Sequence, residues 1–279
     1  MQSGLYIVAT PIGNMGDITT RAVQVLSVAN AVACEDTRIT GKLMHYHGLS
    51  AQLVRYDEHS APKARPGLIK RLLAGEVVAL VSDAGTPLVS DPGYKLVREA
   101  VEAGITVYPL PGASSVMAAL AVAGLPSDRF LFAGFLPVKQ VARRSELNEL
   151  VEIKATLIFL ESAKRIAKSL ADMAAVLGDR EAAVCRELTK LYEEVRRGSL
   201  PELAAHYAQA GSPKGEIVFV VGPPTGVRVE IDIDAALTEL LVDHSVKESA
   251  ALLAARTGKP KREVYARALV LSSPTKSGG

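Results

Sequence analysis

The stretch Val81-Ser82-Asp83-Ala84-Gly85-Thr86-Pro87-Leu88-Val89-Ser90-Asp91-Pro92-Gly93 decides the fold class of this 279-residue chain. It follows residues 77–81, a short apolar run that is typical of a strand buried on both faces, and it precedes residues 94–103, which have the pattern of a helix. Open α/β sheets bind ligands in such loops, at the carboxyl ends of their strands. Because Gly85 has no Cβ, another molecule could approach its backbone, so we expect this loop to hold a ligand.

Part of the same stretch has a simpler interpretation. Asp91 could be the N-cap of the following helix, with Pro92 at the first helical position. That interpretation leaves residues 83–87 unexplained. Both alternatives stay open for Asp91.

The strand-loop-helix pattern recurs along the first half of the chain. Residues 5–10 form a predicted strand, followed by a turn and a helix over 18–29 that Asp17 would cap. Residues 31–34 form a strand that delivers Glu35-Asp36-Thr37-Arg38 to the same edge of the sheet, unless Asp36 or Thr37 merely caps the next helix. An ordinary dinucleotide fingerprint is not expected, because the glycines near residue 13 lack the Gly-x-Gly spacing.

Two further segments complete this half. A strand at 52–56 leads into residues 57–66, which we expect to form a polar, proline-containing loop. A strand at 105–109 turns into an apolar helix that ends at Ala123 and that we expect to be buried. Ser114 and Ser115 at its start suit a small polar ligand, but they also suit plain N-capping.

Turn residues at 124–128 predict a hinge, after which strands and helices alternate again. We therefore expect an N-terminal α/β domain (1–124), a C-terminal α/β domain (125–228) and a helical tail (229–279). In the tail, Ser245 and Glu248 predict a capping box, and a turn at 257–259 precedes a second helix. Two helices with basic residues on the second resemble a helix-turn-helix nucleic-acid unit, although a helical cap with a solvated basic face has the same pattern.

Composition narrows the function classes. The net charge of +2 indicates no general polyanion binder, so any nucleic-acid surface must come from local clusters of charge. Cys34 and Cys185 form no CxxC pair and the histidines have no ligand spacing, so we predict no metal and no disulfide. The chain shows no leader and no long apolar run, which predicts a cytoplasmic, soluble protein without a membrane contact.

Several motifs together resemble one family. They are residues 9–14 (ATPIGN), 34–38 (CEDTR), 80–93, 109–112 (PLPG), 124–130 (GLPSDRF), 134–137 (GFLP), 186–190 (RELTK) and 215–218 (GEIV). In this combination the chain resembles the bacterial small-subunit rRNA 2′-O-methyltransferase I family of the tetrapyrrole-methylase superfamily. The resemblance extends over about residues 4–222, and the helical tail is also similar.

The resemblance implies a tetrapyrrole-methylase-like fold with two α/β domains, a cofactor cleft between them and a small helical extension. It implies a homodimer that uses S-adenosylmethionine to methylate a cytidine ribose in the decoding region of 16S rRNA. It further implies that the cofactor pocket is lined by Ile12, Gly13, Asp83, Gly85, Thr86, Val89, Ser114, Ser115 and Leu160.

The chemistry asks the protein to align the ribose oxygen behind an activated methyl group and to accept one proton. We expect Glu35, Asp36 and Arg38 at the cleft, with one acid taking the proton, and Asp91, Glu161 and Arg165 as weaker candidates. Basic clusters predict RNA contacts at Lys139, Arg143, Arg144, Arg196, Arg197, Lys261, Arg262 and Arg267. A corrin or porphyrin methylase and a non-catalytic RNA-binding assembly factor are the two alternatives.

Overall fold

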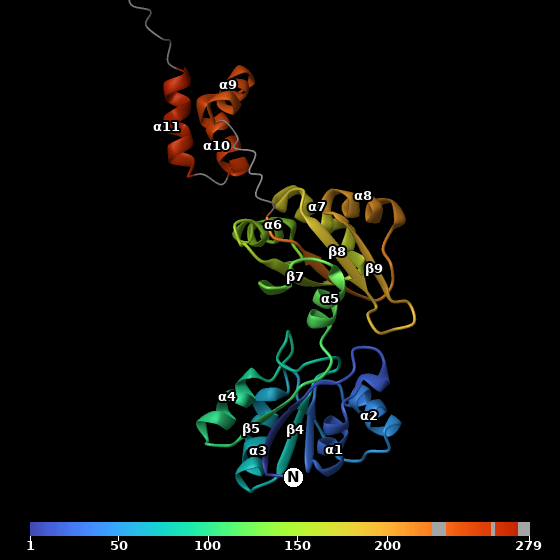
Figure 1. Ribbon diagram of the computed structural model, residues 1–279. Helices are drawn as coiled ribbons and strands as arrows, with labels where there is room; N and C mark the ends of the chain where they lie inside the picture. The colour runs from blue at the N-terminus through green and yellow to red at the C-terminus, as the bar shows by residue number, and fades with distance from the viewer. Residues whose placement is uncertain (225–232, 258–259, 273–279) are drawn as a thin grey trace, which may run out of the picture. The chain divides into compact units, whose positions relative to one another are not determined.

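The computed structural model describes residues 1–224, 233–257 and 260–272, and the chain divides into two compact units, residues 1–224 and 225–279. The first unit contains two five-stranded sheets and their helices, and the described part of the second contains three helices (Figure 1). This mixed α/β architecture with a helical C-terminal extension confirms the fold class expected from the sequence.

The first sheet is parallel throughout, with the strand order β3-β2-β4-β1-β5. Its central strand β4 pairs with β1 on one side and β2 on the other, and all its residues are buried, as its apolar sequence predicts. The strands are β1 (Gly4–Val8), β2 (Ala31–Cys34), β3 (Gln52–Arg55), β4 (Val77–Val81) and β5 (Val107–Leu110). The helical segments are η1 (Met15–Asp17), α1 (Thr20–Val28), α2 (Thr37–Tyr46), α3 (Ala61–Leu73) and α4 (Tyr94–Glu102).

The second sheet is mixed, with the order β6-β7-β10-β8-β9. Only β6 and β7 pair in parallel; the other neighbours are antiparallel, and β8 and β9 form a hairpin. The strands are β6 (Phe130–Phe135), β7 (Thr156–Ser162), β8 (Glu181–Arg186), β9 (Glu194–Ser199) and β10 (Glu216–Val221). The helical segments are α5 (Ser115–Ala123), α6 (Gln140–Glu149), η2 (Ala163–Arg165), α7 (Ile166–Leu177) and α8 (Leu200–Ala210).

Helix α5 packs on the second sheet although it precedes the predicted hinge. Its residues Val116 and Leu120 share a core with Ile158 and Val218, whereas α6, α7 and α8 pack with Phe159 in a separate core. Neighbouring strand residues face opposite sides of a sheet, so α5 covers one face and the other three helices cover the second. The boundary at residue 124 stays a prediction.

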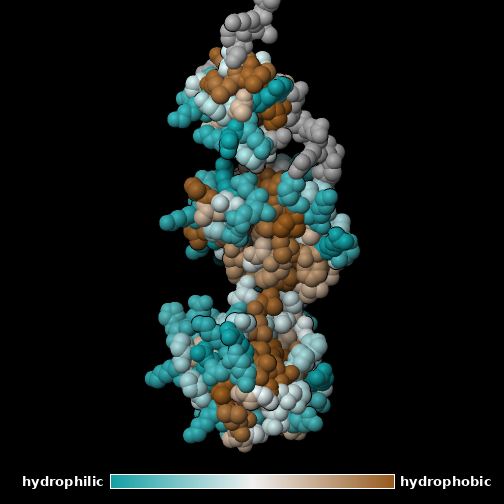
Figure 2. All heavy atoms as spheres, turned by 90° about the vertical axis from the view of Figure 1, so that its left-hand side faces the viewer, coloured by the Kyte–Doolittle hydropathy of each residue, from teal (hydrophilic) through white to brown (hydrophobic). Residues whose placement is uncertain are grey.

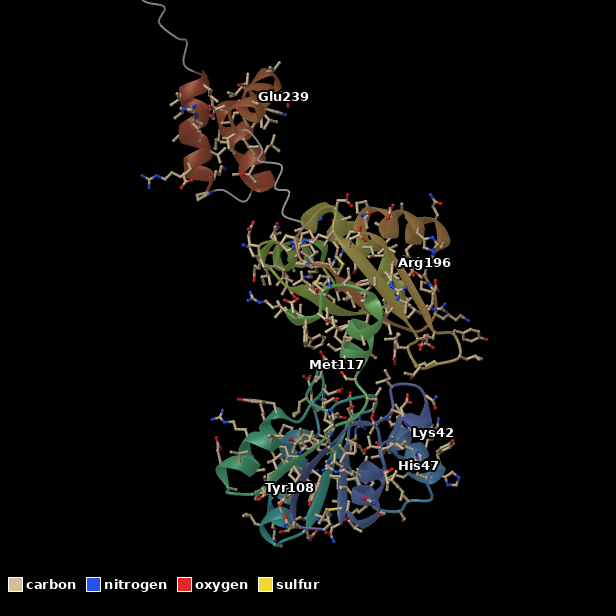
Figure 3. The ribbon with its side chains drawn as sticks, viewed as in Figure 1. Lys42, His47, Tyr108, Met117, Arg196 and Glu239 are labelled. Carbon is tan, nitrogen blue, oxygen red and sulfur yellow. The ribbon has the colours of Figure 1, made fainter. Side chains whose placement is uncertain are left out.

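The apolar helix α5 is not fully buried, which corrects the expectation drawn from its sequence. Its residue Met117, labelled in Figure 3, is 51% exposed, and Val122 is 37% exposed. Only the side of the helix that faces the second sheet is covered, with Ala119 completely buried. An all-apolar sequence predicts that every side of a helix is buried, but one sheet covers only one side of α5.

Further large apolar side chains are exposed at and beyond the edge strand β6. Phe135, Val138 and Val141 are 56%, 77% and 85% exposed. Figure 2 shows brown, apolar side chains at the surface over this half of the first unit. Contiguous exposed apolar surface on a folded domain is typical of a protein–protein contact.

Two local expectations are wrong. Residues 57–66 were expected to form a loop, but α3 begins at Ala61, with Pro62 in its first turn and Pro66 inside. Proline is tolerated in a first helical turn because the N–H it lacks has no intrahelical partner there. Likewise Thr19, not Asp17, caps α1, and its side chain accepts a hydrogen bond from the N–H of Ala22.

The described part of the second unit consists of α9 (Ile233–Asp243), α10 (Val246–Thr257) and α11 (Lys261–Ser272). Its core contains Leu237, Ala250, Leu253, Val264 and Ala268. The capping box is confirmed, because the N–H of Ser245 donates to Glu248 at 3.1 Å and the N–H of Glu248 donates to the Ser245 hydroxyl at 3.3 Å. The sequence had not indicated α9, and part of the predicted turn at 257–259 lies outside the described residues.

Candidate functional site

Three loops meet at the carboxyl edge of the first sheet. They follow β1, β4 and β2, which are neighbours in a parallel sheet, so their polar residues share one edge. Thr10 and Gly85 join the first two loops through a pair of backbone hydrogen bonds of 2.9 and 3.0 Å. The N–H of Asp36 in the third loop donates to the carboxylate of Asp83 at 3.0 Å. These bonds hold the three loops in one arrangement.

The loop after β4 has an unusual backbone. Gly85 has φ +89°, and Leu88 and Ser90 have φ of +76° and +61°, a region that residues with side chains rarely adopt. The Ser82 hydroxyl donates to the Gly85 carbonyl at 3.0 Å and helps to hold this conformation. Backbone strain of this kind clusters at ligand-binding sites.

The same loop decides between the alternatives for Asp91. The N-cap of α4 is Gly93, with φ +137°, and no side chain caps the helix. Asp91 therefore does not cap α4, and the simpler interpretation of this carboxylate is wrong. Its carboxyl group is available for another role at the edge of the sheet.

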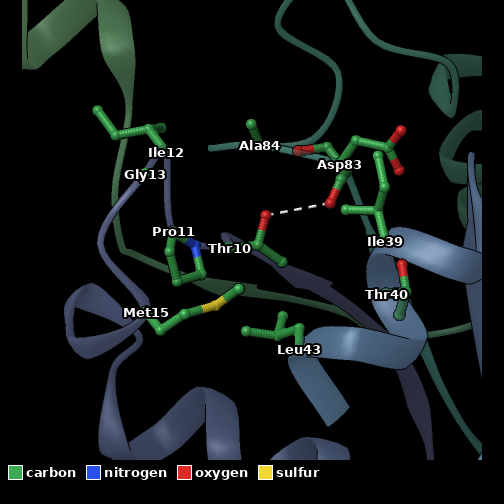
Figure 4. Close-up of a pocket in the computed structure, with 11 residues that line it drawn as sticks. Thr10, Pro11, Ile12, Gly13, Met15, Ile39, Thr40, Leu43, Asp83 and Ala84 are labelled. Carbon is green, nitrogen blue, oxygen red and sulfur yellow. Dashed lines mark hydrogen bonds between the residues drawn. The ribbon is translucent and has the colours of Figure 1, made fainter. Parts of the chain in front are cut away.

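A cavity of about 170 Å³ opens between the loops after β1 and β4 and helix α2 (Figure 4). It brings together Ile12, Gly13 and Asp83 of the predicted cofactor residues. The other lining residues are Thr10, Pro11, Met15, Ile39, Thr40, Leu43, Ser82 and Ala84.

The remaining predicted cofactor residues continue from this cavity toward the second sheet. A Cβ on Gly85 would lie 3.2 Å from Ile12 Cγ2 and 3.8 Å from Ser114 Cα, so these three residues are in close contact. Val89 and Leu160 pack into the same apolar cluster as Ile12. Thr86 Oγ1 donates to the carbonyl of Ala113 at 3.0 Å, and Ser114 caps α5, which Ser115 begins.

Of the predicted catalytic residues, Asp36 and Arg38 form an ion pair with each other. The Asp36 carboxylate accepts hydrogen bonds from the Arg38 N–H at 2.8 Å and from its guanidinium at 2.6 Å, and it caps α2. These hydrogen bonds lower the pKa of Asp36 to about 2. The capping alternative thus describes Asp36 correctly.

Glu35, Asp83 and Asp91 form an acidic cluster in which the pKa of each carboxyl group is raised, unlike that of Asp36. Burial, followed by the charge of Asp83, raises the pKa of Glu35, and burial also raises that of Asp83. Burial and the charges of Glu35 and Asp83 raise the pKa of Asp91 to about 6, against a hydrogen bond from Ser82. Asp91 is thus partly protonated just below neutral pH.

The loop after β8 contacts this site, although none of its residues is among the predicted site residues. The N–H of Asn14 donates to Thr189 Oγ1 at 3.2 Å, and a Cβ on Gly13 would lie 2.9 Å from that oxygen. Lys190 is held by Glu187 and Glu216 at 2.8 and 3.1 Å. Only the RELTK motif, already part of the family resemblance, could have pointed to this loop.

Glu161 and Arg165 lie in the second half of the unit and form a structural network. The Glu161 carboxylate is 4% exposed, accepts hydrogen bonds from Ser169 at 2.5 Å and the N–H of Ser162 at 2.7 Å, and pairs with Arg165 at 3.2 Å. Arg165 also donates to the carbonyl of Leu136 at 2.6 Å. These contacts hold the start of the 136–139 loop.

The predicted RNA-contact residues of the first unit differ in whether they already form ion pairs within the protein. Arg143 is 4% exposed and bound to Asp172, while Arg144 pairs with the same carboxylate at 2.6 Å. Burial opposes ionisation of Asp172, but hydrogen bonds from these two arginines outweigh it and lower its pKa. Lys139 is exposed.

Two more arginines of this set lie on β9. Arg196, labelled in Figure 3, pairs with Glu194 at 2.9 Å. Arg197 donates to the carbonyls of Val122 and Ala123 and so caps the end of α5. Arg197 and the buried Arg143 are thus structural residues in this fold.

Over residues 1–224, 233–257 and 260–272, no three His, Cys, Asp or Glu side chains are placed to hold a metal ion. In the same segments no helix has both the length and the apolar character that crossing a membrane requires. Cys34 and Cys185 are both buried and unpaired.

Comparison with known proteins agrees with this geometry. Residues 4–204 match the family model of tetrapyrrole (corrin/porphyrin) methylases, and residues 228–272 match a model described as the RsmI C-terminal HTH domain. The ribosomal RNA small subunit methyltransferase I of Mesorhizobium japonicum is 50% identical over 100% of this chain and 95% of its own length. That of Erythrobacter litoralis is 52% identical over 98% of this chain and 97% of its own.

The chain belongs to the ribosomal RNA small subunit methyltransferase I family. Members of this family are rRNA methyltransferases by name, and the resemblance seen in the sequence motifs is confirmed.

Solved structures of other proteins share the fold of this chain. A diphthine synthase matches with a TM-score of 0.61 and 18% identity, covering 78% of this chain and 89% of its own. A uroporphyrin-III C-methyltransferase from Thermus thermophilus, in complex with S-adenosylhomocysteine, matches with a TM-score of 0.54 and 20% identity, covering 78% of this chain and 97% of its own. At these identities the likeness shows the fold alone.

Proposed function

We propose that the protein transfers the methyl group of S-adenosylmethionine to the 2′-oxygen of a cytidine ribose in the decoding region of 16S rRNA, acting in the cytoplasm. The proposal rests on one combined observation. The chain matches relatives named as rRNA methyltransferases over their full length, and it has a cavity at the edge of the first sheet where α/β proteins bind ligands. The family resemblance suggests the nucleotide and the atom.

The residues at this edge suit the cofactor. Gly85 is buried and joins the loop after β4 to the loop after β1, so its backbone is not itself open to a ligand as the sequence suggested. The apolar side chains of Ile12, Val89 and Leu160 lie in one cluster beside it. The acidic cluster of Glu35, Asp83 and Asp91 favours a cation, such as a sulfonium. When bound, S-adenosylmethionine would supply an activated methyl group. The nine predicted cofactor residues remain our proposal for its binding site.

We assign the proton acceptor to Asp91. A general base works best when its pKa lies near the operating pH, and the pKa of Asp91 is raised to about 6, whereas that of Asp36 is lowered to about 2. Asp91 is not used as a helix cap, and its neighbour Glu35 raises its proton affinity. Asp36 and Arg38 then have a positioning role, because Asp36 caps α2 and its N–H holds Asp83.

The proposed reaction can be tested with radiolabelled S-adenosylmethionine and small ribosomal subunits from a strain that lacks the corresponding gene. We expect label on the ribose of one cytidine in 16S rRNA, located by mass spectrometry of nuclease fragments. Label found only on an added tetrapyrrole acid would support the corrin or porphyrin alternative. Binding to the subunit without transfer of label would support a non-catalytic assembly factor.

A homodimer is part of the same proposal. The exposed apolar side chains Phe135, Val138 and Val141 offer a surface that a second copy would cover. We expect light scattering to give twice the mass of one chain, and Val141→Asp to lower it to one chain, because an unpaired charge in an apolar contact is costly. Val101→Asp, on an exposed position of α4, is the control and should leave the mass unchanged. A dimer that survives Val141→Asp would exclude this surface.

A further inference from the structure

The described part of the C-terminal unit contains a hollow whose lining is suited to an anionic chain. The hollow measures about 400 Å³ and is lined by Lys247, Lys261, Arg262 and Tyr265. Lys247 lies in the first turn of α10, and the other three lie in the first two turns of α11. Two helices that are separate in sequence thus bring three cations and one aromatic ring to the same place.

Among the side chains that the structure describes in this unit, no carboxylate pairs with Lys247, Lys261 or Arg262. In contrast, Arg267 forms an ion pair with Asp234. Of the adjacent acids, Glu248 is bound to the hydroxyl and N–H of Ser245, which lowers its pKa, and Glu263 is exposed. The predicted RNA contact at Arg267 is therefore less suited to a ligand than those at Lys261 and Arg262.

The aromatic ring adds a second kind of contact. Tyr265 is 39% exposed although it lines the hollow, so one part of its side chain remains accessible. Proteins that bind single-stranded nucleic acid combine a cationic groove for the phosphates with aromatic rings on which bases stack. Lys261 and Arg262 also lie at the N-terminus of α11, where the helix dipole favours an anion.

We propose that this hollow binds a single-stranded segment of RNA, with phosphates on Lys247, Lys261 and Arg262 and one base stacked on Tyr265. The choice of RNA rests on the proposed function. The hollow then serves as a docking site for the substrate that is separate from the site of methyl transfer.

The charge contacts are tested in the full-length protein with a short, fluorescein-labelled single-stranded RNA and fluorescence anisotropy. We expect Lys261→Glu/Arg262→Glu to weaken binding roughly tenfold or more and to reduce the salt dependence of log K by about 1.4, the value for two lost phosphate contacts. The control is Lys70→Glu/Lys154→Glu, which changes the net charge equally at two exposed lysines. Lys70 lies on α3 and Lys154 precedes β7, so neither lines the hollow.

The stacking contact has its own pair of variants. Tyr265→Ala should weaken RNA binding by roughly 5- to 100-fold, whereas Tyr265→Phe, which keeps the ring, should bind within a factor of about 3 of the wild type. With small subunits as substrate, Tyr265→Ala should raise KM and leave kcat near the wild-type value, because the reacting groups lie elsewhere. Circular dichroism of each variant checks that the helices are intact.

The proposal is overturned if the Lys261/Arg262 variant binds RNA as the Lys70/Lys154 control does, or if Tyr265→Ala has no effect. A protein that binds anionic lipid vesicles more tightly than RNA through these residues would also overturn it. Failure of the proposed function gives a different result: RNA binding would depend on the hollow, yet no methyl group would reach 16S rRNA. Normal methylation in all tail variants would leave the proposed function intact and would exclude the hollow as a docking site for the substrate.

Discussion

Asp91→Asn is expected to lower kcat for methyl transfer by roughly 10²- to 10⁴-fold, the usual contribution of a general base. The substitution preserves size and removes only the proton-accepting oxygen. Asp36→Asn is the matched control, because asparagine caps a helix about as well as aspartate does, so α2 should stay in place and transfer should fall far less. The measurement is the initial rate with saturating cofactor. Equal losses for the two variants would contradict the assignment of Asp91.

The pH profile gives a signature that a structural role of Asp91 would not produce. The acidic limb of kcat/KM, which reports the free enzyme, should lie near the pKa of Asp91, about 6. Because the charge of Glu35 raises this pKa, Glu35→Gln should move the limb to lower pH. A limb that stays in place in the Glu35→Gln protein would show that another group sets it.

Stability distinguishes lost chemistry from lost folding in these variants. The folded protein holds the pKa of Asp91 above its usual value of 3.8, so this carboxyl destabilises the fold as the pH rises from 3.8 through about 6. At mildly alkaline pH, Asp91→Asn should therefore melt at the same temperature as the wild type or higher. The gain is expected to be on the order of 1 kcal/mol after allowance for solvent screening.

Gly85→Val is expected to weaken binding of S-adenosylmethionine at least about tenfold, equivalent to roughly 1.4 kcal/mol. The backbone of Gly85 has φ +89°, and a Cβ would meet Ile12 Cγ2 at 3.2 Å. A branched side chain must therefore move the loop after β4 or the loop after β1, and with them Asp83 and the bridge to Thr10. Titration calorimetry with S-adenosylmethionine and S-adenosylhomocysteine measures the loss.

Gly75→Val is the control for the cost of backbone strain alone. Gly75 has φ +83°, similar to Gly85, but a Cβ there would meet no atom within 4 Å, and it lies between α3 and β4 at the opposite end of the strand. Gly75→Val should lose about 1–2 kcal/mol of stability and Gly85→Val at least as much, since both place a side chain in a left-handed conformation. Cofactor binding that is equal in the two variants would show that Gly85 is only a turn residue.

Sequence patterns were sufficient to predict most strands, their order along the chain and the loops that follow β1, β2 and β4. Residues 77–81 form a fully buried strand and the Ser245–Glu248 capping box forms as predicted, because strand burial follows from composition and caps follow from spacing over a few residues. The motifs at residues 9–14 and 80–93 were likewise sufficient to indicate the family.

The roles of the charged residues, in contrast, depend on their neighbours in the folded protein. From the sequence, Asp36 is a stronger catalytic candidate than Asp91. In the structure, hydrogen bonds from the neighbouring Arg38 lower the pKa of Asp36, whereas burial beside two carboxylates raises the pKa of Asp91. Arg143 has the sequence context of an RNA contact, yet it is buried against Asp172. The charge state and exposure of a side chain depend on groups that are distant in sequence and become its neighbours only when the chain is folded.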